Sequence, residues 1–464
     1  MTTVEPTRPN IVFLHTHDTG RFVSPYGAPV PTPRLQRFAE EGVLFRQAYA
    51  AAPTCSPSRA ALLTGQAPHS AGMMGLAHWG HELSDRRQHL AHTLTGAGYH
   101  TALVGQQHVT EPLDHVSLGY AELLPSTGPR AAELVLGVVD FLGRGHDRPF
   151  FLSVGLFETH TMSDGGGTFG YPGTGESYGA PPPGLPSTPE TRSDSASFRA
   201  AALVADDAYG QILDAIDAAG LRESTLVVIT TDHGVALPGM KATLTDAGTG
   251  VLLIMRGPGG FAGGRLCESL VSQIDLFPTF CDLLRIDPPV WLQGRSLLPV
   301  VHEGVEVNEV VFSESTYHVS YQPQRCVRNR RWSYLRDFSD WHTPRLANVD
   351  DSASKDLWVA SGWARREVPN ERLHDLVLDP LEQVNLVDDP AYAAVLADLR
   401  ARLTAWMERT ADPLLSGPVP HPPGRPPLPD DAVSPADLCA ADVLCPASGS
   451  SARLRAAAAP IIGE

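Results

Sequence analysis

The chain of 464 residues has few cysteines and no long apolar run. Its six cysteines are scattered without a C-x-x-C spacing, so the sequence indicates neither a zinc cluster nor a disulfide framework. A run of about 18 apolar residues, which a membrane-spanning helix needs, is absent, and residues 1–10 lack the apolar core of an export signal. We therefore expect a cytoplasmic protein without a membrane anchor.

Basic residues are also scarce relative to acidic ones. Lys and Arg number 35 against 52 Asp and Glu, which gives a formal net charge of -17. No run of Lys or Arg offsets this charge, so nucleic acid and anionic membranes are not expected as partners. An anionic substrate would need a local basic pocket. Nothing in the sequence indicates an oligomeric state.

Short apolar runs alternate with helix-like segments through the first 300 residues. Five runs rich in Val, Ile and Leu predict strands that are buried on both faces: residues 11–14, 101–104, 150–154, 226–230 and 251–254. Other segments predict helices: residues 33–41, 58–63, 130–142 and 198–219. This alternation is typical of an α/β protein with a mostly parallel, mixed central sheet that is flanked by helices.

The C-terminal part of the chain has a different pattern. Short alternating segments at residues 310–312 and 332–336 precede a predicted helix at residues 391–409. We predict three regions: a catalytic α/β domain at residues 1–300, a smaller α+β domain at 301–412, and a Pro- and Ala-rich tail at 413–464. The tail should be poorly ordered or wrap the surface, because little in it could bury a core. Residues 163–197, rich in Gly, Pro and Ser, predict a long loop near the site mouth.

One short motif carries the most specific chemical information. Cys55-Ser56-Pro57-Ser58-Arg59 is followed by residues 60–65, which continue as a short helix. An isolated cysteine is most often a small buried hydrophobic residue, but a nucleophile at the start of a helix faces backbone N–H groups that favour an anion. The segment resembles the signature of the type I sulfatase family, which belongs to the alkaline phosphatase superfamily.

This resemblance implies an alkaline-phosphatase-like fold and the conversion of Cys55 to formylglycine by a formylglycine-generating enzyme. The hydrated aldehyde offers two hydroxyl groups on one carbon. One hydroxyl attacks sulfur, and the other lets the sulfated intermediate collapse by C–O cleavage, which a serine could not do. The resemblance therefore implies a sulfuric ester hydrolase.

Two strand ends match the family's ligands for a divalent cation. The first strand of the family ends in two Asp, and here His17 stands in the first of these positions and Asp18 in the second. Residues 227–231 form a later strand, which is followed by Asp232-His233-Gly234 where the family has D-N-G or D-H-G. The implied metal ligands are His17, Asp18, Asp232, His233 and residue 55 itself. Calcium is the metal of first choice by family, and the two imidazoles make Mg²⁺, Mn²⁺ and Zn²⁺ competitive.

The resemblance also implies residues that surround the sulfate group. Arg59 would hold the formylglycine hydroxyl and the ligand carboxylates, and Lys241 corresponds to a Lys that follows the second ligand strand in the family. His108 would hydrogen-bond the formylglycine or the leaving oxygen. His160 corresponds to the family's downstream His.

Residue 106 departs from the family pattern. The segment Gly105-Gln106-Gln107-His108 matches the family's G-K-x-H in position but carries Gln106 in place of Lys. The lost charge would weaken sulfate binding or leaving-group stabilisation unless another cation such as Arg21 compensates.

Within the family, residues 65–73 and 107–109 are most similar to the heparan N-sulfatase, or sulfamidase, branch. His69, in the first of these segments, would either line the substrate pocket or serve as a structural residue at a helix end. The substrate implied by the resemblance is a sulfate ester or sulfamate of a carbohydrate or small organic molecule.

Three functions stay open at this point. The first is sulfate ester or sulfamate hydrolysis. The second is hydrolysis of phosphonate monoesters or phosphodiesters, because relatives in the same superfamily use formylglycine with a similar metal set. The third is a sulfatase-like binding protein with impaired catalysis, which the departures at Gln106 and His17 would explain.

Overall fold

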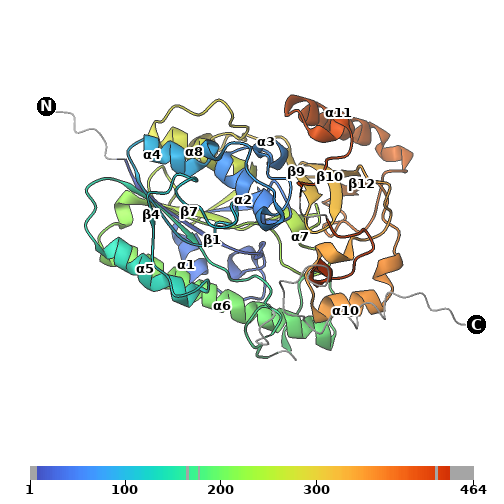
Figure 1. The fold of residues 1–464 in the computed structure, drawn as a ribbon, viewed down its shortest axis with the longest axis horizontal. Coiled ribbons are helices and arrows are strands. Elements are labelled where there is room, and N and C mark those ends of the chain that lie inside the picture. Colours follow the sequence, from blue (N-terminus) through green and yellow to red (C-terminus); the bar gives the residue numbers. More distant parts are fainter. Residues whose placement is uncertain (1–7, 163–166, 176–177, 424–426, 439–464) are drawn as a thin grey trace, which may run out of the picture.

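The computed structural model describes residues 8–162, 167–175, 178–423 and 427–438 (Figure 1). Two sheets organise these residues. The larger sheet lies between two layers of helices, and the smaller sheet lies beside it, next to helix α11. Loops from both parts meet between the two sheets.

The large sheet contains eight strands in the order β4-β3-β5-β1-β6-β7-β2-β8. Within it, β7 runs antiparallel to its neighbours β6 and β2, and the other pairings are parallel. This arrangement confirms the predicted mostly parallel, mixed sheet. The strands are β1 (Asn10–Thr16), β2 (Val43–Tyr49), β3 (His100–Gly105), β4 (Glu122–Leu123), β5 (Phe150–Gly155), β6 (Thr225–Thr231), β7 (Leu253–Arg256) and β8 (Arg265–Ser272).

Both faces of this sheet are buried under helices. Side chains alternate along β1, so that Ile11 and Phe13 enter one apolar core while Val12 and Leu14 enter the other. The first core is covered by α2 (Cys55–Thr64), α4 (Leu90–Gly96), α8 (Leu276–Leu284) and α9 (Leu298–Glu303). The second is covered by α1 (Pro33–Glu41), α5 (Ala131–Gly143) and α6 (Pro189–Ala218). Among the described residues, every helix is too short or too polar to cross a bilayer.

The sequence located five strands of the large sheet and missed β2, β4 and β8. The predicted runs lie in β1, β3, β5 and β6, and the fifth run overlaps β7. β2 was missed because Arg46 and Gln47, both half-buried, interrupt its apolar run. β8 was missed because its first residues are exposed at the sheet edge and only its second half is buried.

Helix α6 corrects the predicted loop at residues 163–197. The helix begins at Pro189 and not near residue 198, so the last part of the predicted loop is helical. Proline is compatible with the first turn of a helix, and Thr188 caps that turn by accepting a hydrogen bond from the backbone N–H of Thr191 at 3.5 Å. The polar first turns carry no apolar periodicity. Residues 163–166 and 176–177 lie outside the described residues.

The small sheet is antiparallel, with the order β12-β11-β10-β9. Its strands are β9 (Val311–Tyr317), β10 (Tyr321–Arg328), β11 (Trp332–Asp337) and β12 (Glu371–Asp375). One face packs against α11 (Ala393–Arg409) through Val327, Tyr334 and Leu373. The smaller antiparallel region therefore confirms the predicted C-terminal fold. The domain boundaries at residues 300 and 412 stay predictions.

The expectation that the tail buries little is wrong for its described part. Four of its apolar side chains are buried: Leu414, Val419, Leu428 and Val433. The backbone N–H of Leu428 donates to the carbonyl oxygen of Val319 at 2.9 Å. Because these apolar residues are isolated among prolines, no periodic pattern marks them, yet Leu414 and Val419 join the core under α11 and Leu428 and Val433 join two smaller clusters. Residues 439–464 lie outside the described residues.

Candidate active site

The site candidates gather at the carboxyl edge of the large sheet, where ligand sites of parallel sheets form. β1 and β6 are parallel neighbours, and their last residues, Thr16 and Thr231, lie opposite each other. The residues that follow the two strands are therefore side by side. These residues are the predicted metal ligands His17, Asp18, Asp232 and His233.

Helix α2 brings Cys55 to the same place. Cys55 is the first residue of this helix, and all ten residues of the helix are buried. Its sulfur lies 3.4 Å from Nε2 of His233. Burial raises the pKa of the Cys55 thiol well above its ordinary value, although the charge of Lys241 opposes this effect. An unmodified Cys55 is therefore an uncharged thiol at neutral pH.

The geometry of the five predicted ligands fits a single cation. Each residue offers one ligand atom, the five atoms lie within 4.8 Å of one another, and all five residues are buried. Metal–ligand distances of roughly 2.0–2.6 Å place the ligand atoms of one ion within about 5 Å of each other. The donor set combines two imidazoles, two carboxylates and residue 55.

The hydrogen bonding of His233 also fits a metal ligand. Its Nδ1 lies 3.0 Å from the carbonyl oxygen of Gly234, so Nδ1 carries the proton. Its Nε2 faces Asp18 Oδ1 at 3.1 Å and Asp232 Oδ2 at 3.7 Å. The nitrogen and the two carboxylates thus converge on one point, as the ligand atoms of a bound cation do. A backbone carbonyl on the other nitrogen is the usual support of a metal-bound His.

Positive groups keep the two carboxylates ionised. Burial by itself would raise the pKa of Asp18, but Lys241, followed by His17, lowers it well below its ordinary value. Burial would also raise the pKa of Asp232, but neighbouring groups, His17 first among them, lower it below the ordinary value. Burial lowers the pKa of His17 to about 4 in spite of the two carboxylates. The cluster therefore presents two carboxylates and a neutral imidazole at neutral pH.

Arg59 connects the cysteine motif to the strand ends. This side chain is almost fully buried, and its Nε and Nη2 lie 3.1 and 3.0 Å from Oδ2 of Asp232. Its Nη1 lies 2.7 Å from Nδ1 of His15, and Nη2 donates to the carbonyl oxygen of Thr16 at 3.1 Å. A fixed positive charge thus lies beside a ligand carboxylate. His15 was missed because, inside an apolar strand, it carried no motif.

Lys241 lies between a ligand candidate and an acidic residue that the sequence did not indicate. Its Nζ is 2.7 Å from Oδ2 of Asp18 and 2.8 Å from Oδ2 of Asp350. Burial would lower the pKa of Lys241, but Asp18, followed by Asp350, raises it well above its ordinary value. Lys241 is therefore charged. Asp350 lies in the chain between β11 and β12 of the small sheet. No motif or spacing in the sequence relates it to the ends of β1 and β6.

Three histidines lie on the more accessible side of the cluster. His160 and His108 are half-buried, and their rings lie 4.4 and 6.0 Å from the ring of His17, measured between centroids. The exposed His78, which was not predicted, stacks on His108 at 5.4 Å. Nδ1 of His108 is buried and has no hydrogen-bond partner among the described residues. Burial lowers the pKa of His108, so its neutral ring can bond a substrate atom.

Gln106 lies at the same edge, directly after β3, and brings no charge. Its backbone N–H donates to the carbonyl oxygen of Gly155 at 2.8 Å. Arg21 does not replace the missing charge. Its Nη1 lies 3.3 Å from Asp246, and its Nη2 donates to the carbonyl oxygen of Ala48 at 2.8 Å. Arg21 is therefore not the compensating cation, because Asp246 already neutralises its guanidinium.

His69 does not line this site. It lies in α3 (Pro68–Ala71), is buried, and bonds Glu314 through both its backbone N–H, at 2.8 Å, and its Nδ1. Its ring packs against Trp406, with the centroids 5.3 Å apart. The structural alternative predicted for His69 is the correct one.

Residues from distant parts of the chain cover Cys55. The apolar cluster around its side chain consists of Leu76, Trp79, Val319, Ala347 and Leu428. Leu428 comes from the C-terminal segment. That segment therefore forms part of the wall around the candidate nucleophile.

The comparison with protein families agrees with this arrangement. The family model described as Sulfatase matches residues 9–286, which is more than half of the chain. The chain therefore belongs to the sulfatase family, as the Cys55 motif indicated, and is a sulfuric ester hydrolase.

The relatives cover nearly the whole chain. N-sulphoglucosamine sulphohydrolase of Homo sapiens is 30% identical in an alignment that covers 89% of this chain and 92% of the relative. A solved 2-O GAG sulfatase has a TM-score of 0.68 at 22% identity and covers 88% of this chain and 94% of its own. The phosphonate monoester hydrolase of Agrobacterium radiobacter has a TM-score of 0.66 at 21% identity, with coverages of 88% and 97%. These two structures support the fold alone.

Proposed function

We propose that this sulfatase hydrolyses a sulfate ester or sulfamate of a carbohydrate with residue 55 as a formylglycine nucleophile. The observation that carries the proposal is the position of Cys55 within 4.8 Å of four further ligand candidates, with Arg59 bonded to one of them. The human relative's name refers to an N-sulphated glucosamine, which favours a sulfated amino sugar as substrate. A formylglycine-generating enzyme would act before folding, because Cys55 is buried in the folded chain.

In the first half-reaction, one hydroxyl oxygen of the hydrated aldehyde attacks sulfur while the bond from sulfur to the leaving oxygen or nitrogen breaks. The leaving group takes up a proton. In the second half-reaction, the other hydroxyl loses its proton and the C–O bond to the sulfate breaks. This step releases sulfate and restores the aldehyde, which water then hydrates again.

The side chains around residue 55 would orient the nucleophile, bind the sulfuryl oxygens and contact the leaving atom. We assign Arg59 to orient the attacking hydroxyl, because its guanidinium is fixed by Asp232 and His15. We assign Lys241 and His160 to the sulfuryl oxygens and His108, with its unpaired Nδ1, to the leaving atom. Gln106 would contribute a neutral hydrogen bond in place of the family's charge.

A divalent cation, when bound by His17, Asp18, Asp232 and His233, would neutralise charge on the sulfuryl group and align residue 55. Family resemblance favours calcium. The two imidazoles oppose this choice, because calcium, like Mg²⁺, prefers oxygen ligands, whereas imidazole suits transition metals such as Mn²⁺ and Zn²⁺. Mg²⁺ stays a candidate through the two carboxylates. Elemental analysis of the purified protein identifies the metal.

Paired kinetics test the reaction class. We expect the enzyme, produced with a formylglycine-generating enzyme, to hydrolyse 4-nitrophenyl sulfate or an N-sulphated glucosamine with a larger kcat/KM than a phenyl phosphonate ester. The Cys55→Ala variant is the matched control for background turnover. A larger kcat/KM on the phosphonate would overturn the sulfatase assignment.

Phosphonate monoester or phosphodiester hydrolysis is the second candidate. It is favoured by the Asp232-His233 pair and by the fold shared with the phosphonate monoester hydrolase. A third candidate, a binding protein with impaired catalysis, is motivated by Gln106 and His17. A protein that carries an unmodified thiol at residue 55 and no metal in its native host would favour this third candidate. The cytoplasmic location stays a prediction, which fractionation of the native host tests.

A further inference from the structure

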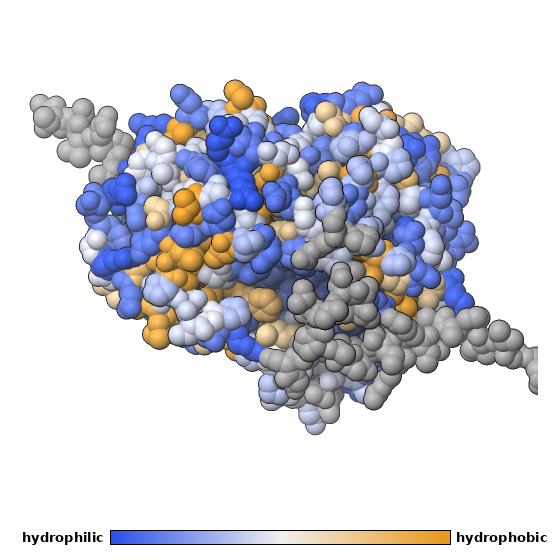
Figure 2. Space-filling view, viewed as in Figure 1, coloured by the Kyte–Doolittle hydropathy of each residue, from blue (hydrophilic) through white to orange (hydrophobic). Residues whose placement is uncertain are grey.

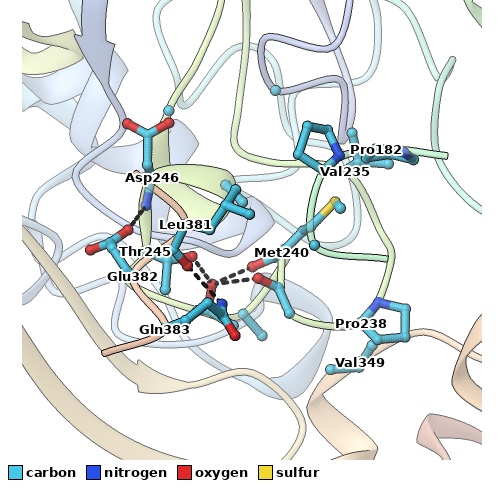
Figure 3. A pocket seen from close by; sticks show the side chains of 18 of the residues that line it. Pro182, Val235, Pro238, Met240, Thr245, Asp246, Val349, Leu381, Glu382 and Gln383 are labelled. Atoms are coloured by element: carbon cyan, nitrogen blue, oxygen red, sulfur yellow. Dashed lines mark hydrogen bonds between the residues drawn. The ribbon is translucent and has the colours of Figure 1, made fainter. Parts of the chain in front are cut away.

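A cavity of about 970 Å³ lies between loops of the large sheet and the small sheet. Figure 2 shows the surface hollowed in this region, and Figure 3 shows part of the lining. Gly20, Met240 and Ala242 line the cavity and adjoin the catalytic segments, but Cys55 is not among its lining residues. Its volume is at the upper end of the range of about 300–1,000 Å³ that small-molecule sites occupy. The cavity is therefore a candidate site beside the catalytic cluster and separate from it.

The small sheet turns a polar face toward this cavity. Because side chains alternate along a strand, Leu373 enters the core under α11 while its neighbours Arg372 and His374 point to the opposite face, where they line the cavity. Gln324 and Asp337, from the two adjacent strands, also line it. A sheet face built in this way exposes hydrogen-bonding groups to a ligand and not an apolar surface to a protein core.

Arg372 is the cation of this face that lacks a partner. Its Nε is buried without a hydrogen bond, and it forms no ion pair with the described residues. The nearby carboxylates are engaged: Asp337 accepts from Gln324 at 2.7 Å and Glu382 from Arg328 at 2.8 Å. Burial lowers the pKa of Arg372, and these carboxylates oppose the effect only in part. A half-buried guanidinium whose buried Nε has no acceptor is unfavourable, and an anionic ligand would relieve that cost.

The remaining walls supply aromatic faces and neutral polar groups beside charged side chains such as Arg345, Arg366 and Glu367. Trp341, Trp358 and Trp363 line the cavity, and all three are half-buried. The rings of Trp358 and Trp363 lie 5.2 Å apart in an edge-to-face arrangement, and Nε1 of Trp341 is buried without a partner among the described residues. Amide side chains complete the lining: Gln322, Gln324, Asn348, Gln383 and Asn385.

In Figure 3, Glu382 and Gln383 lie opposite Pro238 and Val349, so polar and apolar walls face each other. Amides bond hydroxyl groups, and flat indole rings contact the C–H faces of sugar rings. One half-buried guanidinium without a hydrogen-bond acceptor among the described residues matches one carboxylate or sulfate rather than a polyphosphate. These features together describe the recognition of a sugar ring that carries a single acidic group.

We propose that this cavity binds an acidic saccharide, with its carboxylate or sulfate on Arg372 and a sugar ring against the tryptophans. The site would hold a saccharide unit that is not the one hydrolysed, because Cys55 lies outside the cavity. This binding does not depend on the proposed reaction.

Calorimetric titration of the full chain with a hyaluronan tetrasaccharide tests the proposal. This probe carries carboxylates and no sulfate, so it tests the cavity independently of sulfate hydrolysis. We expect one site per chain, unchanged in the Cys55→Ala variant. Arg372→Gln should weaken binding about tenfold or more, because a hydrogen bond to a charged group is lost.

Arg336→Gln is the matched control. Arg336 lies on the neighbouring strand but is exposed and does not line the cavity, so its substitution should change the affinity less than about twofold. Trp363→Ala provides a second variant if Arg372→Gln does not fold. The absence of binding to the wild type, equal effects of the two arginine substitutions, or tighter binding of ATP or of neutral cellotetraose would overturn the proposal.

Discussion

Two buried clusters among the described residues combine histidine with carboxylates, and they differ in how many ligand atoms converge. One surrounds Cys55, and the other consists of His69, Glu314 and Asp412, whose ligand atoms also lie within 4.8 Å of one another. In the second cluster, Arg325 binds Asp412 with both arms, Nε to Oδ2 at 2.5 Å and Nη2 to Oδ1 at 2.9 Å. His69 occupies both oxygens of Glu314. Every carboxylate oxygen there has an N–H donor.

The cluster at Cys55 brings two imidazoles to one carboxylate oxygen. Asp18 Oδ1 lies 2.5 Å from Nδ1 of His17 and 3.1 Å from Nε2 of His233, and the sulfur of Cys55 lies 3.4 Å from the same Nε2. The two clusters therefore contain similar residues, but five ligand atoms converge in the first and three in the second. We infer that the first holds a cation, whereas the second connects α3, β9 and the C-terminal segment as an internal salt bridge.

The largest expected effect distinguishes a catalytic role of Cys55 from a role in packing. Cys55→Ala should reduce turnover of the preferred sulfate by on the order of 10³-fold or more while the melting temperature stays close to that of the wild type. Cys55→Ser should stop at a covalent sulfate ester that mass spectrometry detects. Cys281→Ala, at another buried cysteine, is the control and should keep full activity. Multiple turnover by either Cys55 variant would refute the mechanism.

The second effect separates the clusters by metal content. Asp18→Asn should lower the bound metal, measured by elemental analysis after dialysis, by more than about tenfold, because a charged ligand is lost. Asp412→Asn should leave the metal content unchanged. Equal metal loss in the two variants would contradict the distinction between the clusters.

The third effect concerns stability. Asp412→Asn should lower the free energy of unfolding by about 3 kcal/mol, because it removes the carboxylate that two nitrogens of the buried Arg325 bind. Chemical denaturation of the metal-free proteins measures this difference. The folded fraction of the variant should retain the wild-type kcat. A loss below about 0.5 kcal/mol would show that the second cluster is not a structural ion pair.

The difference in the free energy of unfolding between wild type and Asp412→Asn should also depend on pH, and the direction of this smaller effect can be predicted. Burial would raise the pKa of Asp412, but Arg325 lowers it below the ordinary value of 3.8. A carboxyl with a depressed folded pKa stabilises the fold fully above its unfolded pKa, and this contribution is lost as the pH falls through the folded value. The gap between wild type and Asp412→Asn should therefore be constant from about pH 6 to 5 and shrink below about pH 4. A gap that widens with acid would contradict the assignment.

The smallest effect concerns the departure at Gln106. Gln106→Lys should raise kcat/KM on aryl sulfates by a few fold, because it restores a cation at the edge where sulfate binds. Gln107→Lys, at the next position, is the control and should not improve catalysis. An unchanged or lower rate for Gln106→Lys would mean that the pocket is organised around the neutral amide.

The local parts of the site could be predicted because each is a short segment with its own signal. The Cys55–Arg59 motif lies on one helix, and the two ligand pairs follow apolar strands that a parallel sheet places side by side. The predicted strands and the residues at their ends therefore required no long-range information.

The parts that escaped prediction depend on tertiary contacts. Asp350 reaches Lys241 from the smaller part, and Leu428 reaches the Cys55 cluster from the tail. Neither residue belongs to a periodic pattern or to a motif of fixed spacing in the sequence. His69 was ambiguous for the same reason, because its partner Glu314 lies 245 residues away.

The most direct test of the central claim is the mass of the peptide that contains residue 55, measured on protein that has been shown to be active. We predict an aldehyde at this position in a fraction of molecules that rises in proportion to specific activity. Active protein in which this peptide carries an intact thiol throughout would contradict the account.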